Sequence, residues 1–388
     1  MRHLLTDRVR AVEPSPIRSM FDLAEAAAAE GRDLVRLEVG EPDFDTPEHV
    51  VEAAHEAARS GRTHYTPNAG IRPLREAVSE ATARESGTEV PPEGVVVTNG
   101  AMEATYLVAL ATVGTDEEYL LPTPTYTNYF QQTDLVAGRA VEVPMPASTG
   151  FELDADRVVE AMGPDTAAVM LCSPSNPTGR VHDPDAVRAV VEAAADHDAV
   201  VVADEVYGGL VYDREFVGTA ALTDHPEHVV TVGSCSKTYA MTGWRVGWLA
   251  GPRWLADAVT KVREAVTSCT ATPSQYAALA ALTGPQEPVR EMRDRFEERR
   301  DYVVERAAGV DGVRCPRPDG AFYAFLELDL PGDDVAVAER LLREHGVVLA
   351  PGSAFGEAGA GWHRLSFANG LDRLEVGFDR LERALSAF

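Results

Sequence analysis

Short apolar segments alternate with longer amphipathic ones from about Val95 onward. Each of the short segments is nearly continuous in apolar residues. This pattern is typical of strands that are buried on both faces of a mostly parallel sheet. The segments are VVVTNG, EYLLPTP, RAVEVPMP, AAVMLCSP, AVVVADEVY, VVTVGSCSK and RVGWLAGP. The stretches between them, such as AMEATYLVALATV and DPDAVRAVVEAAADHD, have the length of crossover helices. The pattern predicts an α/β fold whose large domain holds a mostly parallel, seven-stranded sheet sandwiched by helices.

A Gly/Pro break, GPQEP at residues 284–288, closes this region. Mixed strands and helices follow it, which is typical of a smaller α+β domain. The expected elements are a long charged helix VREMRDRFEERRDYVVERAAG, a strand AFYAFLELD, a helix VAVAERLLREHG, strands GVVLAPG and HRLSFA, and a C-terminal helix. The N-terminal residues lack a core of their own and are expected to pack onto this part. We therefore predict a small domain from residues 1–45 and 284–388, and a large domain from residues 46–283.

Charge is the unusual feature of the composition, because 62 acidic and 35 basic residues give a net charge of −27 over 388 residues. Such a surface repels the phosphates of nucleic acids and of anionic membranes, which argues against both as partners. The only lysines in the sequence are Lys237 and Lys261. An excess of acids with so few lysines indicates a halophilic protein in a high-salt cytosol, since salt screens the repulsion. A GC-rich genome would explain the missing lysines but not the surplus acids.

The chain shows no targeting or metal-binding pattern. No apolar run is long enough to cross a bilayer, and MRHLLTDRVR carries charges where a signal peptide has its apolar core. The four cysteines lack the spacing of a metal site or of a disulfide framework. These features predict a cytoplasmic protein.

Residues with chemical function gather in the turns that follow the predicted strands. Open α/β sheets bind ligands at the carboxyl ends of their strands. The glycine turn NGAMEA at 99–104 opens a helix whose free N–H groups can hold an anion. The other turns supply Asn176 between two prolines, Asp204 and Tyr207 in ADEVY, Ser234, Ser236 and Lys237 in GSCSK, and Arg245 eight positions further on.

Each of these features has a plain structural alternative when taken alone. A glycine turn is common, Asp204 could cap a helix, Tyr207 could belong to the core and Arg245 could form a surface ion pair. Taken together they describe one ligand, because an anion cradle with hydroxyls and an arginine suits a phosphate. An amine suits an aldehyde, and a carboxylate suits a ring nitrogen that must stay protonated. The ligand that combines these groups is pyridoxal 5′-phosphate.

With these motifs the sequence resembles the class I/II aminotransferases of fold type I, which depend on pyridoxal phosphate. The resemblance covers nearly the whole chain. It is carried by LEVGEPDFDTP, HYTPNAGIRPLREA, TNGAMEA, PTYTNY, SPSNPTG, ADEVY, SCSKTYAMTGWRVG, PDGAFYAF and HRLSFA. The combination of SxSKxxxxxGxRxG with NPTG and DEVY upstream is highly specific.

The resemblance implies catalytic roles for Lys237, Asp204 and Tyr207. Lys237 corresponds to the lysine that forms the Schiff base and then carries a proton between the substrate Cα and the cofactor C4′. Asp204 corresponds to the carboxylate paired with the pyridine nitrogen. Tyr207 and Asn176 correspond to the donors to the phenolic oxygen of the cofactor.

The resemblance also assigns the residues around the cofactor and the substrate. Tyr126 takes the place of the aromatic residue that stacks on the ring, and Arg364, with Gly40 and Asn176, takes the place of the substrate contacts. Tyr65 matches a tyrosine that reaches the phosphate of the neighbouring subunit's cofactor, which implies a homodimer with shared active sites. The positions that match phosphate-binding residues are Gly100, Ala101, Met102, Ser234, Ser236 and Arg245.

The implied reaction moves the amino group of an L-amino acid to a 2-oxo acid by a ping-pong mechanism. The same scaffold also serves β-lyases and eliminating synthases, which remain the alternative, and non-catalytic binding modules usually lose the lysine. Nucleotide enzymes are excluded by the absence of GxxxxGK[ST] and of a strand-borne GxGxxG. We expect a substrate with a neutral or apolar side chain, because the glycine turn NGAME lacks a lysine. An arginine could still bind a distal carboxylate, and Arg18 is the candidate, although a solvated surface arginine is the simpler interpretation.

Overall fold

A seven-stranded sheet organises the larger part of the molecule within residues 5–387, the range that this computed structural model describes. The strand order is β2-β8-β7-β6-β5-β3-β4, and all neighbours are parallel except β8, which is antiparallel to β2 and β7. The strands are β2 (Val95–Thr98), β3 (Glu118–Thr123), β4 (Arg139–Pro144), β5 (Thr166–Cys172), β6 (Val200–Asp204), β7 (Val229–Ser234) and β8 (Gly247–Ala250). The prediction of seven strands in a mostly parallel sheet is confirmed.

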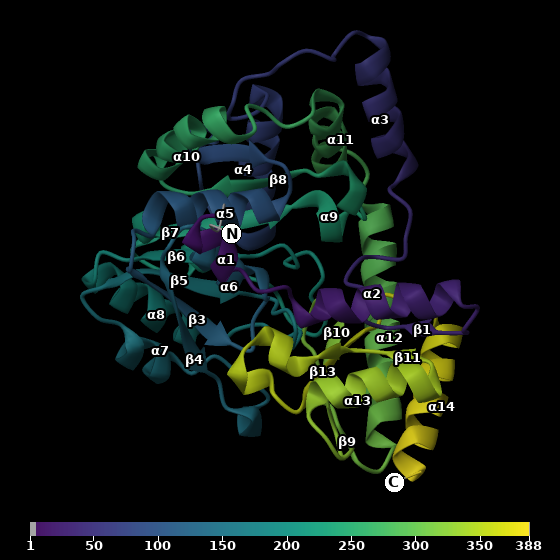
Figure 1. The fold of residues 1–388 in the computed structure, drawn as a ribbon. Coiled ribbons are helices and arrows are strands. Elements are labelled where there is room, and N and C mark those ends of the chain that lie inside the picture. Colours follow the sequence, from purple (N-terminus) through teal and green to yellow (C-terminus); the bar gives the residue numbers. More distant parts are fainter. Residues whose placement is uncertain (1–4, 388) are drawn as a thin grey trace.

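Helices cover both faces of this sheet (Figure 1). On β6, Val201 and Ala203 belong to the apolar cluster beneath α7 and α8, whereas Val202 belongs to the cluster beneath α5, α6 and α10. Because neighbouring residues of a strand point to opposite faces, burial of both faces requires the continuous apolar runs of the sequence. The covering helices are α3 (Glu48–Arg59), α4 (Arg72–Ser86), α5 (Ala101–Thr112), α6 (Asn128–Leu135), α7 (Ala155–Ala161), α8 (Pro184–Asp196), α10 (Arg253–Val266) and α11 (Thr272–Thr283). We call these helices and the seven-stranded sheet the large part.

The small part combines α2 and β1, near the start of the chain, with the elements that follow α11, and it lies below the large part in Figure 1. Its antiparallel sheet has the order β12-β13-β10-β9, and a second, two-stranded sheet pairs β1 with β11 in parallel. The strands are β1 (Val35–Arg36), β9 (Val313–Arg314), β10 (Tyr323–Leu328), β11 (Val347–Val348), β12 (Ala350–Pro351) and β13 (Trp362–Ser366). The helices are α2 (Pro16–Ala29), α12 (Glu287–Ala308), α13 (Asp334–Arg340) and α14 (Leu371–Ser386).

Two elements of the small part differ from the sequence prediction. The segment GVVLAPG forms two short strands in different sheets, because β11 pairs with β1 whereas β12 pairs with β13. The helix predicted over VAVAERLLREHG ends at Arg340 as an α-helix and continues as a π-helical turn over Leu341–His345. The left-handed Gly346 (φ +67°) then ends it.

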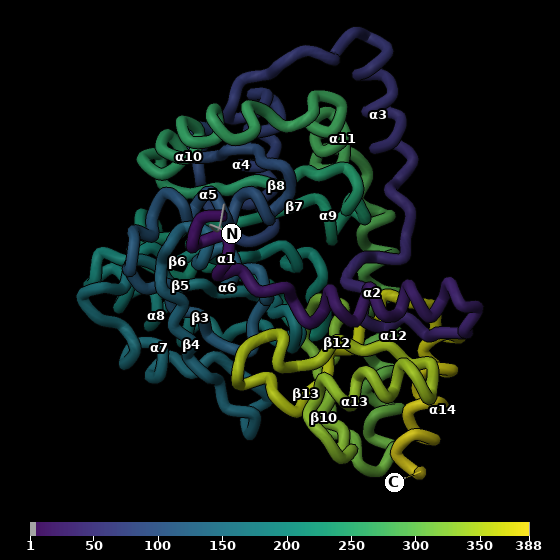
Figure 2. Tube along the Cα trace, viewed as in Figure 1, coloured from purple at the N-terminus to yellow at the C-terminus, as the bar shows by residue number. Residues whose placement is uncertain are grey.

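The N-terminal segment bridges the two parts. Figure 2 shows it running from α1 (Asp7–Ala11), beside α6 of the large part, to α2 and β1 of the small part. The segment therefore packs on the small part only from α2 onward. The domain boundaries at residues 45 and 284 stay a prediction. No helix among the described residues is both long and apolar enough to cross a membrane.

Candidate active site

The carboxyl ends of β5, β6 and β7 face the small part across a cavity of about 390 Å³. Its lining includes most of the predicted site residues, drawn from both parts of the chain. These are Gly40, Ala101, Met102, Tyr126, Asn176, Asp204, Tyr207, Ser234, Ser236, Lys237, Arg245 and Arg364. Residues more than 300 positions apart in the sequence thus share one cavity, as Gly40 and Arg364 illustrate.

Lys237 lies on the short helix α9 (Cys235–Thr238), directly after β7. Its Nζ donates a 2.6 Å hydrogen bond to the carbonyl of Gly40, which comes from the segment after β1. Burial and the nearby charge of Arg364 lower the pKa of Lys237 to about 8. This amine therefore loses its proton more readily than that of an ordinary lysine, as a nucleophile or a base requires.

Asp204 ends β6 and is almost fully buried. Its Oδ2 accepts a 2.7 Å hydrogen bond from the hydroxyl of Tyr129, and its Oδ1 accepts one of 3.2 Å from the backbone N–H of Val206. Burial raises the pKa of Asp204 although these bonds and the charge of Lys237 act against it. The ionised carboxylate therefore gains from a cationic partner, and a protonated ring nitrogen would be one.

The start of α5 forms the expected anion cradle. Gly100 has φ +81° at the N-cap, and a Cβ there would lie 2.5 Å from Nη2 of Arg245. Only glycine suits this position, because it meets both a left-handed backbone and a close side chain. A Cβ at Gly247 would likewise lie 2.6 Å from the backbone nitrogen of Ala101. The free N–H groups of the first turn and the Arg245 guanidinium thus converge, as a phosphate requires.

The hydroxyls of GSCSK lie beside this cradle. The Oγ of Ser234 donates a 2.9 Å hydrogen bond to the carbonyl of Val246 and lies 2.9 Å from the Oγ of Ser236. The backbone N–H of Ser236 in turn donates to the Oγ of Ser234 at 3.0 Å. Both serines are buried and both line the cavity, so they stand where phosphate oxygens would need donors.

The opposite wall of the cavity carries Arg364, which lies on β13 and is 3% exposed. Its Nη1 donates to Oδ1 of Asn176 at 3.0 Å, and its Nη2 donates to the carbonyl of Glu38 at 2.6 Å. Its Nε has no hydrogen-bond partner among the described residues. The guanidinium also lies over the ring of Tyr323, 4.5 Å from its centroid. A buried cation held in this way with an unused donor suits a substrate carboxylate.

Tyr129, Tyr323 and Glu38 are site residues that the sequence reasoning missed. The hydroxyl of Tyr323 lies 2.9 Å from that of Tyr207, and all three missed residues line the cavity. Tyr129 and Tyr323 stand inside the motifs PTYTNY and PDGAFYAF, so the signal was present. Only packing shows that these two tyrosines also reach the cavity.

Three predicted residues lie outside the lining. Gly100 borders it through Ala101, as described above. Tyr65 is 89% exposed and does not meet the cavity of its own chain. Arg18 pairs with Asp22 at 3.0 Å on the exposed face of α2, so the simpler interpretation of Arg18 fits the structure.

The site offers a suitable partner for the phosphate, the aldehyde and the ring nitrogen of pyridoxal phosphate. The cradle at Gly100 with Arg245 suits the phosphate, the amine of Lys237 suits the aldehyde, and the buried carboxylate of Asp204 suits the ring nitrogen. The fit rests on donors and charges that this chain supplies within one cavity.

Comparisons with known proteins agree with this geometry. Residues 32–376 match the family model "Aminotransferase class I and II". The chain is 39% identical to aromatic-amino-acid aminotransferase 2 of Thermococcus litoralis, with 98% of each chain covered. It is 37% identical to a probable aspartate/prephenate aminotransferase of Aquifex aeolicus, with 99% of each chain covered.

The fold agrees equally well. The solved aspartate aminotransferase of Thermus thermophilus with maleate superposes with a TM-score of 0.94 at 38% identity, covering 99% of this chain and 100% of the other. These relatives favour amino-group transfer over β-elimination or eliminating synthesis. The chain belongs to the class I and II aminotransferase family, whose members transfer amino groups with pyridoxal phosphate.

Proposed function

We propose that the protein moves the amino group of an L-amino acid with a neutral side chain to a 2-oxo acid, such as 2-oxoglutarate, by a ping-pong mechanism. The observation that carries this proposal is the shared cavity of Lys237, Asp204 and Arg364. This cavity is lined by an amine of lowered pKa, a buried carboxylate and a buried guanidinium. In a ping-pong reaction the first 2-oxo acid leaves before the acceptor enters.

Pyridoxal phosphate, when bound, supplies an aldehyde that takes up the amino group and a ring that withdraws electrons from the substrate Cα. Lys237 would hold the cofactor aldehyde through its amine and would move the proton between the substrate Cα and the cofactor C4′. Asp204 keeps the proton on the ring nitrogen, and Tyr129 orients Asp204 by its 2.7 Å hydrogen bond.

The remaining residues hold the cofactor and the substrate in place. Tyr207 and Asn176 would donate to the phenolic oxygen of the cofactor, and Tyr126 would supply an aromatic face for its ring. Arg364 binds the substrate α-carboxylate beside Gly40, whose carbonyl also accepts from Lys237. The residues that hold the phosphate are Gly100, Ala101, Met102, Ser234, Ser236 and Arg245.

The proposed preference for a neutral side chain rests on the charges of the cavity. Among the described residues that line it, the cations are Lys237, Arg245 and Arg364, and each already has a role. The remaining charged residues of the lining that lie near the substrate contacts are the acids Glu38 and Glu41. A distal carboxylate would therefore meet no further cation among the described residues of the lining. The T. litoralis relative bears the name of an aromatic-amino-acid aminotransferase, which agrees with a neutral side chain.

A dicarboxylic amino donor is the second candidate, because other relatives bear the name of aspartate aminotransferases. Such a substrate would need a cation from a partner subunit. Initial rates with 2-oxoglutarate and single amino acids separate the two candidates: phenylalanine, tyrosine, leucine and alanine against aspartate. The proposal expects a higher kcat/KM for a neutral donor and parallel double-reciprocal plots. A preference for aspartate, or intersecting plots, would contradict it.

We also propose a homodimer with shared active sites, in the cytoplasm, with neither nucleic acid nor membrane as partner. The exposed ring of Tyr65, outside the cavity of its own chain, supports a role at a neighbouring subunit's site. The charge of −27 supports adaptation to high salt. A thermal midpoint that falls as KCl is raised to molar concentration would contradict the halophilic proposal.

A further inference from the structure

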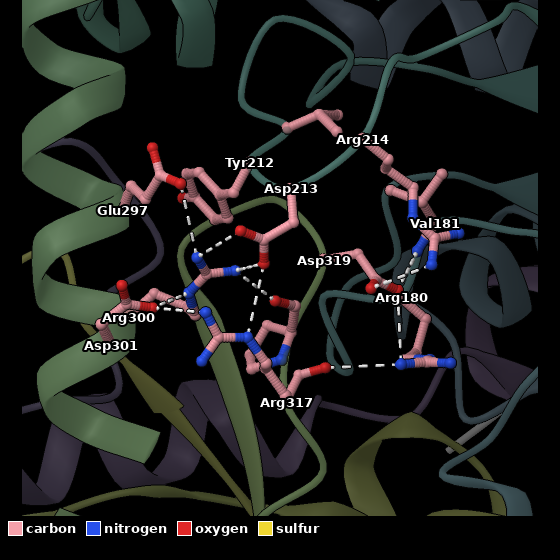
Figure 3. Close-up of polar contacts among 12 residues, drawn as sticks. Arg180, Val181, Tyr212, Asp213, Arg214, Glu297, Arg300, Asp301, Arg317 and Asp319 are labelled. Atoms are coloured by element: carbon pink, nitrogen blue, oxygen red, sulfur yellow. Dashed lines mark hydrogen bonds and ion pairs between the residues drawn. The ribbon is translucent and has the colours of Figure 1, made fainter. Parts of the chain in front are cut away.

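Two clusters of ion pairs, linked by a 3.4 Å contact from Nη1 of Arg180 to the carbonyl of Arg317, lie between α12 and three loops that lead into the active site (Figure 3). We call them together the junction network. None of its charged residues lines the central cavity. Each loop nevertheless leads within a few positions to a site residue: Arg180 follows Asn176, Asp213 follows Tyr207, and Asp319 precedes Tyr323. The members of the junction network are Arg180, Asp213, Arg214, Arg300, Asp301, Arg317 and Asp319.

Arg300 is the buried centre of the junction network. It lies on α12 with no exposed surface, and its Nη1 donates to Oδ2 of Asp213 at 2.9 Å and to the carbonyl of Pro318 at 3.1 Å. Its Nε donates to Asp301 at 2.6 Å, and its guanidinium lies 4.8 Å from the ring centroid of Tyr212. One side chain of the small part thus holds both a loop of the large part and the segment before β10.

The charges of this centre form a closed ring. Arg317 contacts the same two acids as Arg300, Asp213 at 3.4 Å and Asp301 at 2.8 Å. Partial burial acts to raise the pKa of Asp213, but its contacts with Arg300 and Arg317 outweigh burial and lower that pKa. Two guanidinium groups therefore face these two carboxylates, and a third, that of Glu297, lies 3.6 Å from Nη2 of Arg300, so the buried charge of Arg300 is compensated.

The carbonyl of Pro318 connects this ring to the active site through the backbone. The next residues are held from both sides, since the N–H groups of Asp319 and Gly320 donate to the carbonyl of Gly179 at 2.9 and 2.8 Å. On the other side, Tyr212 donates from its N–H to the carbonyl of Asp319 at 3.0 Å and from its hydroxyl to that of Ala321. Ala321 has φ +57°, a conformation that alanine keeps only when its surroundings enforce it.

Tyr323 follows Ala321 by two positions, and its hydroxyl lies 2.9 Å from that of Tyr207. The two tyrosines reach this contact from different parts of the chain, Tyr207 after β6 and Tyr323 at the start of β10. Tyr323 also carries the guanidinium of Arg364 over its ring. The position of Tyr323 therefore affects both Tyr207, on the proposed cofactor side of the cavity, and Arg364, on the proposed substrate side.

We propose that Arg300 is a positioning residue for amino-group transfer: by fixing Asp213 and the carbonyl of Pro318 together, it sets the hydroxyl of Tyr323 against that of Tyr207. The proposal rests on the role proposed above for Tyr207 at the phenolic oxygen. Loss of the contact would leave Tyr207 without its partner and Arg364 without its fixed support. Displacements of about 1 Å at such distances from the reacting atoms can cost up to 100-fold in rate.

The test uses the holoenzyme with Arg300→Met, which keeps the length of the side chain and removes its donors. Two quantities are measured: kcat, and the pH at which the absorption of the bound cofactor changes. We expect kcat to fall by about 10- to 100-fold and the spectral transition to shift in the same direction as in Tyr323→Phe. In the Tyr323→Phe background, the further effect of Arg300→Met should be below about twofold, since both changes act through one contact.

Matched controls separate positioning from stability. Arg295→Ala removes an arginine of the same helix whose partner is Glu298 on the exposed face, and it should leave both quantities unchanged. Arg300→Lys keeps the buried charge and one contact to Asp213, so it should fold and show the same shift at reduced size. It serves as the test if Arg300→Met does not fold.

The proposal is overturned if Arg300→Met lowers only the thermal midpoint, or if its effect and that of Tyr323→Phe multiply. Failure of the underlying role of Tyr207 is a different result. In that case Tyr207→Phe and Tyr323→Phe would themselves leave the spectral transition in place.

Discussion

The hydroxyl of Tyr129 on α6 donates a 2.7 Å hydrogen bond to Oδ2 of Asp204 at the end of β6. Both residues are buried, and the bond opposes the rise in the pKa of Asp204 that burial causes. The neutral hydroxyl of Tyr129 therefore stabilises the ionised form of Asp204, which is the form that the proposed pairing with a protonated ring nitrogen requires. This relationship explains why an acid can work in so dry a position.

Tyr129→Phe should lower kcat by roughly tenfold, because one hydrogen bond to a charged group contributes about 1.5–3 kcal/mol. Without this donor the pKa of Asp204 rises further, and its hold on the ring proton weakens. Single-turnover kinetics with a saturating amino acid measure the effect. An unchanged rate would show that Tyr129 does not support Asp204 in the reaction. Asp204→Asn should lower the rate by several orders of magnitude in the same assay.

Gly100→Ala should weaken cofactor binding by at least about tenfold. The new Cβ would stand 2.5 Å from Nη2 of Arg245 at a position with φ +81°. Gly61→Ala is the matched control, because Gly61 has the same φ of +81° and nothing within 4 Å of its Cβ position. Fluorescence titration of the cofactor-free proteins gives both affinities. Equal losses in the two variants would mean that backbone strain alone, and not the cradle, determines binding.

The cofactor-free protein should become more stable between about pH 8 and the ordinary lysine pKa near 10.5. In this window the unfolded chain still binds the proton of Lys237 while the folded protein has released it, so raising the pH favours folding. Lys237→Met removes this penalty and should show a higher thermal midpoint than the native protein below pH 8. The difference between the two midpoints should shrink as the pH rises through the window. A difference that is constant with pH would contradict the lowered pKa.

Arg364→Lys should raise KM for the amino acid by about 10- to 100-fold, because an ammonium group cannot make the paired contacts of a guanidinium. It also loses one of the two bonds that now run to Asn176 and to the carbonyl of Glu38. Steady-state kinetics at fixed 2-oxo acid measure the change. A KM that stays at the native value would assign the substrate carboxylate to another residue.

Mixing two inactive variants tests the shared site. In a heterodimer of Lys237→Ala and Tyr65→Ala, one site combines the native lysine of one subunit with the native tyrosine of the other. Activity should therefore appear when the two proteins are unfolded and refolded together, but not when each is refolded alone. Its absence from a confirmed mixed dimer would show that Tyr65 acts on its own subunit or not at all.

The sequence predicts the large part of the fold well because its strands are buried on both faces. Val201 and Val202 must both be apolar, and such a run leaves few alternatives to a covered parallel strand. The segment around Leu349 was harder, since Val347–Val348 and Ala350–Pro351 pair with different sheets. An apolar run of this length carries no information about which neighbours its strand finds.

The residues of the candidate site likewise divide into those that the sequence predicts and those that only the structure shows. The sequence predicts Lys237, Asp204 and Arg245 because together they suit one ligand, and all three line the cavity. Tyr129 and Tyr323 are ordinary aromatic residues within their motifs, and only the packing of α6 and β10 turns their hydroxyls toward Asp204 and Tyr207. The sequence predicts only a long charged helix in this region, and its pattern does not show that Arg300 is the buried arginine of that helix.

The absorption spectrum of the purified protein, recorded in high salt, tests the central claim most directly. Single amino acids are added first and a 2-oxo acid afterwards, with Lys237→Ala as the control. The account predicts a yellow protein whose visible band bleaches with one amino acid and returns with the 2-oxo acid, while Lys237→Ala does not complete this cycle. A protein that stays colourless with added pyridoxal phosphate, or a Lys237→Ala variant that cycles like the native enzyme, would contradict the role of Lys237.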